Sequence, residues 1–141
     1  MAIGSPHLLA NGDIRPARFV KLTYGDGGVA KAFEADANES PIGISQEGTN
    51  TAPIPGVTSD KAAEQGQGLQ LHFEGEECLL ELGGTVAVGN FVKSDADGKG
   101  VAAATTGTDV QYVGATALES GVSGNKIRVK VQLMSHRPAI S

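Results

Sequence analysis

Glycine recurs at short intervals along this chain, and its placement restricts the fold more than any other feature of the sequence. Glycine makes up 20 of the 141 residues, about twice the roughly 7% share in average proteins. Each glycine inside a helix costs about 0.5–1 kcal/mol relative to alanine, which disfavours a helical bundle. There is no period of three, which excludes a collagen triple helix. Many of the glycines stand between apolar runs, where a tight turn requires positive φ: Gly25, Gly27, Gly28, Gly75, Gly83, Gly84, Gly89, Gly98, Gly100, Gly121 and Gly124.

The runs between these glycines have the residue alternation of β-strands. Leu69–Phe73 alternates strictly between apolar and polar residues, and Ile127–Leu133 is the most amphipathic run in the chain. Strands that recur roughly every 8–12 residues are typical of antiparallel sandwiches and barrels. The sequence predicts a mainly β fold: a single-domain antiparallel β-barrel or sandwich with extended N- and C-terminal arms and at most one short helix. The other predicted strands are Arg18–Thr23, Val29–Phe33, Pro41–Ser45, Cys78–Leu82, Thr85–Val88, Phe91–Lys93, Val101–Ala104 and Tyr112–Leu118.

Two local patterns indicate how these strands pair. The glycine-rich segment 25–28 joins the first two predicted strands as a hairpin. A short internal similarity also supports strand pairing: Pro41–Ile44, a polar loop and Leu69–Phe73 resemble Tyr112–Ala117, a shorter loop and Ile127–Val131. Gly43 and Gly114 lie inside predicted strands, where glycine marks a bulge or a close backbone approach.

The predicted domain occupies residues 15–134 and contains a polar insertion loop at 47–68. Part of that loop, 59–66, has an N-cap candidate, an early acid and a final glycine, enough for one or two helical turns. Residues 1–14 form an N-terminal arm and 135–141 a C-terminal tail. The arm is richer in apolar residues than an idle terminus needs, so two interpretations stay open. It forms a strand or clip on its own domain, or it becomes ordered on a neighbouring subunit.

Charge and cysteine content exclude several classes of partner. The formal net charge is −5, with 11 basic and 16 acidic residues and no basic cluster, so we expect no binding to nucleic acid or to an anionic membrane. No apolar run approaches the ~20 residues of a membrane-spanning helix, and the N-terminus lacks a secretion signal. The single cysteine, Cys78, can form no internal disulfide, which suits synthesis in a reducing cytoplasm.

Catalytic, metal and cofactor residues are not predicted. His7 and His136 lie in the predicted arms, and His72 lies on the polar face of a strand. Cys78 stands among leucines, which favours a buried, inert thiol. Asp95–Gly98 has two acids before a glycine, but in a calcium-loop register the first and twelfth positions are wrong, so a hairpin turn is the better interpretation. We therefore expect a protein that is not an enzyme and binds no cofactor.

One segment has the residue rhythm of a carrier domain. Gly83–Gly100 resembles the glycine, valine and aspartate rhythm of lipoyl and biotinyl carrier barrels, which present a modifiable lysine in a hairpin. Lys99 is the hairpin lysine here, but its Asp-Gly-Lys-Gly flank does not match that family. A small carrier or ligand-binding module is kept as the alternative, and modification of Lys99 would favour it.

Residues 20–133 resemble the phage capsid decoration, or head cement, proteins. The matching motifs follow one another in order and spacing: Pro41–Ser45, Gly75–Cys78, Leu82–Val101, Val113–Glu119 and Lys126–Leu133. Asn90 departs from the family rhythm, which has aspartate there. The 47–68 loop is an insertion. The resemblance implies a structural β domain on the outer surface of the virion head, commonly a homotrimer, that bridges major capsid protein subunits and stabilises the expanded capsid. Another phage structural role remains the further alternative.

Apolar residues of the two arms are the predicted contacts with the capsid or with an adjacent protomer. The candidate interface residues are Ile3, Leu8, Leu9, Ile14, Met134, His136, Pro138 and Ile140.

Overall fold

The chain is all β over the residues that the computed structural model describes, which are 7–24, 30–47, 61–63, 68–105 and 109–136. Within those ranges there is no helix, and hence none long and apolar enough to cross a membrane. The predicted mainly β fold is confirmed. The strands are β1 (His7–Leu9), β2 (Phe19–Tyr24), β3 (Ala30–Glu34), β4 (Gly43–Ser45), β5 (Gly68–His72), β6 (Glu77–Glu81), β7 (Phe91–Ser94), β8 (Gly100–Ala102), β9 (Gln111–Ala117) and β10 (Lys126–His136).

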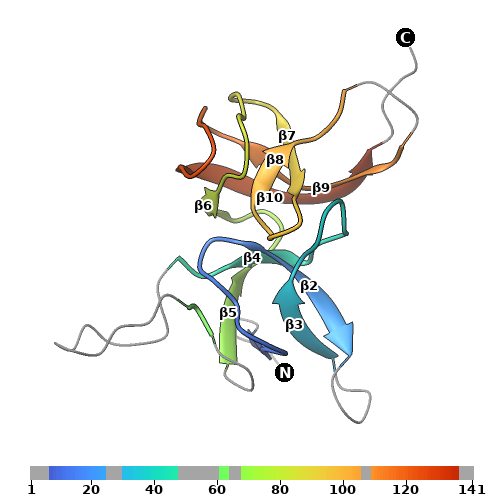
Figure 1. The fold of residues 1–141 in the computed structure, drawn as a ribbon, viewed down its shortest axis with the longest axis vertical. Helices are drawn as coiled ribbons and strands as arrows, with labels where there is room; N and C mark the ends of the chain where they lie inside the picture. The colour runs from blue at the N-terminus through green and yellow to red at the C-terminus, as the bar shows by residue number, and fades with distance from the viewer. Residues whose placement is uncertain (1–6, 25–29, 48–60, 64–67, 106–108, 137–141) are drawn as a thin grey trace, which may run out of the picture.

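These strands form two antiparallel sheets with the same topology. The first sheet has the order β1-β5-β4-β2-β3, and the second has the order β6-β10-β9-β7-β8. Each strand of the second sheet thus takes the place of the strand five positions earlier in the chain. Figure 1 shows the second sheet, coloured yellow to red, above the first, coloured blue to green. The molecule is two copies of one five-stranded unit, which we call repeat 1 (β1–β5) and repeat 2 (β6–β10).

The agreement between the repeats extends to single hydrogen bonds outside the strands. After β1, Asn11 N donates to Ala32 O at 2.8 Å, and after β6, Gly83 N donates to Gly100 O at 2.9 Å. The connection that follows makes an isolated antiparallel bridge in both repeats, between Ile14 and Ala63 and between Val86 and Gly121. Matching bridges at matching points show that the repeats share their connections as well as their strands.

The register of the strands fixes which residues are equivalent. Val20 lies opposite Gly43 in repeat 1, and Val92 lies opposite Ala115 in repeat 2. The Phe-Val-Lys sequence that begins β2 therefore corresponds to the Phe-Val-Lys sequence that begins β7. Leu69–Phe73 corresponds to Ile127–Val131, as the sequence similarity indicated. Gly43 is equivalent to Ala115 and not to Gly114. An alignment of the repeats that paired the two glycines would therefore be shifted by one residue over this strand.

Each repeat buries one face of its sheet. The first core consists of Ala10, Ile14, Val20, Ala32, Ala62, Ala63, Leu69 and Leu71. The second core contains the inward residues of β6, β7, β9 and β10, joined by Phe19, Ala35 and Ile44 from repeat 1. Repeat 1 therefore completes the core of repeat 2, and the two repeats fold as one unit.

Several predicted boundaries change in the structure. The hairpin of β2 and β3 is confirmed, as is the Asp95–Gly98 turn between β7 and β8, where Gly98 has φ of +78°. Thr85–Val88 is not a strand: only Val86 pairs, because Asn90 Oδ1 accepts the Ala87 amide at 2.9 Å and turns the chain.

The termini also differ from the sequence expectation. Residues 7–9 of the arm pair with β5, which supports a strand on its own domain over an arm ordered on a neighbour. At the other end, β10 continues to His136, past the predicted start of the tail at 135. Of the predicted helical turns at 59–66, residues 61–63 are not helical and contain the bridge to Ile14. The rest of that segment lies outside the described residues.

Candidate interaction surfaces

The junction between the repeats centres on Phe19. Its side chain is 0% exposed, and its amide donates to Gly98 O at 2.7 Å. Its ring lies against the backbone of Gly114, where an added Cβ would also come within 2.7 Å of Pro41 Cγ. Gly114 interrupts the register between β7 and β9, so the prediction of a bulge or close approach at this glycine is confirmed. The glycine admits an aromatic ring that any side chain would exclude.

A buried ion pair lies beside this ring. Arg18 Nη2 is 3.3 Å from Glu81 Oε2, and Arg18 Nη1 donates to Asp97 O at 2.9 Å. Lys99 Nζ lies 3.6 Å from the same Glu81 carboxylate. Because the Arg18 side chain is only 6% exposed, losing its partner would leave a charge away from water, which is costly. The pair therefore holds the two repeats in one relative position.

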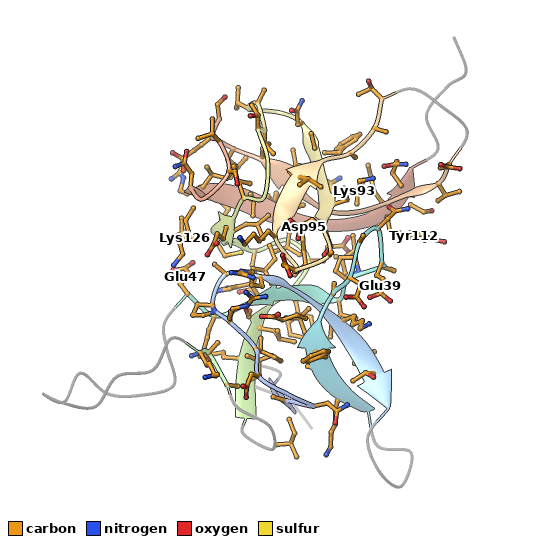
Figure 2. The ribbon with its side chains drawn as sticks, in the orientation of Figure 1. Glu39, Glu47, Lys93, Asp95, Tyr112 and Lys126 are labelled. Atoms are coloured by element: carbon orange, nitrogen blue, oxygen red, sulfur yellow. The ribbon has the colours of Figure 1, made fainter. Side chains whose placement is uncertain are left out.

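Asn38 makes further polar contacts across the junction. It has positive φ, 54°, a conformation that asparagine tolerates better than most residues. Its side-chain amide donates to Val110 O at 2.9 Å, and its Oδ1 accepts the Tyr112 amide at 3.1 Å. Figure 2 shows Glu39 and Tyr112 at this side of the junction, with Asp95 further along it.

Each repeat contains the same lysine clamp. Lys21 Nζ contacts Glu39 Oε1 at 2.7 Å, and that carboxylate also accepts the Asp36 amide at 2.7 Å. At the equivalent place, Lys93 Nζ contacts Gln111 Oε1 at 2.7 Å. The hydrogen bond to Lys21 holds the pKa of Glu39 below its usual value, and the same bond raises the pKa of Lys21. The clamps are structural, since the first joins β2 to the loop before β4 and the second joins β7 to the start of β9.

The candidate reactive residues are placed as follows. Cys78 is a buried, unpaired cysteine, as predicted, and burial raises the pKa of its thiol to about 12. His72 is half-buried rather than exposed, with Glu47 at 3.9 Å and Glu76 at 3.8 Å. The described ranges contain no group of three or more His, Cys, Asp and Glu arranged to hold a metal ion. Lys99 is half-buried and turned toward Glu81.

The predicted interface residues that the structure describes are divided between the two sheets. Leu9 is 47% exposed at the edge of the first sheet, whereas Met134 is half-buried in β10 of the second sheet. Ile14 is fully buried in the first core, so its side chain is occupied within the chain and we do not keep it as a contact residue. Leu8 and His136 lie in β1 and β10. Ile3, Pro138 and Ile140 lie outside the described residues.

The sequence did not identify the other exposed apolar side chains. Two of them, Val88 and Val122, lie on neighbouring loops of repeat 2, because Val88 N donates to Ser120 Oγ at 2.9 Å and Val86 pairs with Gly121. Both valines directly adjoin turn glycines, which is the signal that could have revealed them. In the part of the chain that the structure describes, the exposed large apolar residues are Leu9, Leu22, Phe33, Val88, Phe91, Val110, Tyr112 and Val122.

The fold is similar to that of a solved phage protein. The structure described as "head fiber gp8.5 N base in bacteriophage phi29" matches 92% of this chain and 96% of its own, with a TM-score of 0.61 and 14% sequence identity. No family model matches the chain, and no curated protein matches it. Because the match covers 92% of the chain, the shared fold extends over both repeats.

Proposed function

We propose that this chain is a structural protein of a phage head that binds the outer capsid surface and bridges major capsid protein subunits. The observation that carries the proposal is the fold, shared over 92% of this chain with a structure described as the base of a phage head fibre. The order of motifs that resembles decoration proteins supports the same role. That resemblance also adds a homotrimeric arrangement to the proposal.

The exposed apolar tip of repeat 2, formed by Val88 and Val122, suits a contact with the capsid. Val88 is 63% and Val122 53% exposed, and the bridge between Val86 and Gly121 holds their two loops together. Two neighbouring exposed valines form a small apolar centre of the kind that anchors protein interfaces, with polar loops around it. We propose this tip as one contact, alongside the arm segments 1–6 and 137–141.

A cement protein stabilises a capsid because it binds only the assembled lattice. The stabilisation is RT ln(1 + [L]/Kd), or about 2.7 kcal/mol per site at a hundredfold excess over Kd. Purified protein should therefore co-sediment with expanded empty capsids of its phage and raise their melting temperature. Val122→Asp and deletion of 1–6 should each weaken binding while leaving the fold intact. If neither variant bound capsids more weakly, the assigned contacts would be wrong. If the wild-type protein itself did not bind capsids, the proposed function would be wrong.

Deletion of 1–6 is a better test of the arm than a longer deletion. β1 begins at His7, and Ala10 belongs to the first core. Removing these residues would damage the domain itself, so lost binding could not be assigned to the arm.

The structural match also favours a second candidate, a fibre base. The matched protein is described as the base of a head fibre, and such a base has to hold the capsid but does not have to stabilise it. Capsid melting distinguishes the two functions. Binding with an unchanged melting temperature would favour the fibre base.

A further inference from the structure

The two repeats meet through different surfaces, so the junction takes one surface from each repeat and leaves the equivalent surface of the other repeat outside the junction. Repeat 1 contributes Phe19, Arg18 and Ala35. Repeat 2 contributes other positions, among them Gly98, Glu81 and Ser94. An interface that joins unlike surfaces is heterologous, and such an interface can be repeated with a further copy.

Phe91 in repeat 2 occupies the place that Phe19 occupies in repeat 1. Phe19 lies opposite Ile44 and accepts the Ala35 amide at 2.9 Å. Phe91 lies opposite Thr116 and accepts the Ala103 amide at 2.8 Å. Yet Phe19 is 0% exposed, and Phe91 is 37% exposed. The surface of repeat 2 around Phe91, which we call the Phe91 face, is thus the exposed equivalent of the buried Phe19 face.

Leu22 in repeat 1 occupies the place of Ser94 in repeat 2. Leu22 lies opposite Ala32, and Ser94 lies opposite Gly100. Ser94 is 1% exposed because repeat 1 covers it, with Ala35 O 3.3 Å from its hydroxyl. Leu22 is 52% exposed. An apolar side chain therefore stands in solvent at the position where repeat 2 receives its neighbour.

The charged pair of the junction is replaced at both equivalent positions. The register places Leu9 where repeat 2 has Glu81. Asn90 stands where repeat 1 has Arg18, because Arg18 O accepts the Ser45 amide at 2.8 Å and Asn90 O accepts the Ala117 amide at 2.9 Å. Bringing these surfaces together would pair asparagine with leucine in place of arginine with glutamate, so neither member of the junction's Arg18–Glu81 pair would be buried without the other.

We propose that a second copy of this chain packs its Leu22 and Leu9 surface on the Phe91 face, head to tail, as repeat 2 packs on repeat 1. Ile42 stands where repeat 2 has Gly114, so the Phe91 ring seats less deeply than Phe19 does, and the contact is the weaker of the two. Successive contacts form a closed ring or an open chain, depending on the rotation between copies. This contact would supply the surfaces for the self-association in the proposed function. It is inferred from the geometry of the repeats alone.

The first test measures the mass of the purified chain by sedimentation equilibrium across a concentration series. We expect multiples of the 14.3 kDa chain at high concentration. Leu22→Asp and Phe91→Asp should each weaken association about tenfold or more. Thr116→Arg offers a second change on the Phe91 face that removes no partly buried ring, and Val122→Asp is the matched control, with association unchanged. A wild-type chain that stays monomeric up to several hundred micromolar would overturn the inference.

The second test mixes two variants and decides the orientation. Leu22→Asp retains a native Phe91 face, and Phe91→Asp retains a native Leu22 surface. Each variant alone should be monomeric, and an equimolar mixture should contain dimers that go no further. If wild-type oligomers form but the mixture stays monomeric, the contact joins like surfaces and the inference is wrong. Neither test uses capsids, so failed capsid binding would overturn the proposed function and leave this result standing.

Discussion

Replacing Phe19 by alanine should cost far more stability than the same change at Phe91, although both residues begin a strand with the sequence Phe-Val-Lys. Phe19 is 0% exposed and lies between the repeats, so its removal opens a cavity, at about 3–5 kcal/mol for a core Phe→Ala change. Phe91 is 37% exposed. Its removal leaves no closed cavity. Complete burial of a phenylalanine side chain contributes about 1.5–3 kcal/mol, so the loss of the buried part of this ring should cost about 1–2 kcal/mol. The expected difference is about 2–3 kcal/mol.

Urea denaturation at low protein concentration, where self-association does not contribute, measures this difference. The Phe91→Ala variant should unfold in one transition, like the wild type. The Phe19→Ala variant should have a lower midpoint and, because Phe19 joins the cores of the two repeats, a broader transition as the repeats unfold separately. Equal losses of stability in the two variants would refute the reasoning, since they would mean that the repeats do not depend on this contact.

Three further changes test the junction, the buried thiol and the clamp. Gly114→Ala should lower the melting temperature, because the added Cβ would collide with the Phe19 ring and with Pro41. Cys78 should react with a thiol reagent at pH 8 only after unfolding. Because its pKa is raised to about 12 in the folded state, the folded state should lose stability as the pH rises from about 9 towards 12, where the unfolded thiol ionises first. Glu39→Gln should cost under about 1 kcal/mol at pH 7, since exposed pairs contribute little. The variant should also lose less stability than the wild type as the pH falls through the lowered pKa of Glu39. Urea titrations measure both effects.

Strands were predictable wherever the residue pattern depends on one buried face. Leu69–Phe73 and Ile127–Leu133 alternate because one face of each lies on a core, and both proved to be strands of equivalent position. Thr85–Val88 has similar residues but is a connection, because the Asn90 side chain turns its backbone. A hydrogen bond to a side chain several residues away leaves no mark on the alternation, so the pattern alone could not exclude a strand there.

The interaction surfaces were less predictable than the strands, because exposure is set by contacts distant in sequence. The same Phe-Val-Lys sequence begins β2 and β7, yet Phe19 is fully buried, with its ring against Gly114, and Phe91 is 37% exposed. Within this shared tripeptide nothing distinguishes the two copies. The arm residues were predicted from their apolar side chains. One of them, Ile14, is fully buried and pairs with Ala63, which lies within the predicted insertion at 47–68. Such a pairing is set by the tertiary fold and not by neighbouring residues.

The replacement of charges between the two repeats explains how one chain can keep its internal junction separate from a contact with another copy. Inside the chain, Arg18 meets Glu81 at 3.3 Å. In the proposed contact, Asn90 meets Leu9. A crossed arrangement would place Arg18 against Leu9, burying a guanidinium without its carboxylate, which costs several kcal/mol. Specificity arises as much from such penalties as from favourable contacts. Replacing Leu9 by glutamate and Asn90 by arginine would remove the distinction, so this double variant should exchange repeats between chains and form domain-swapped species that the wild type avoids.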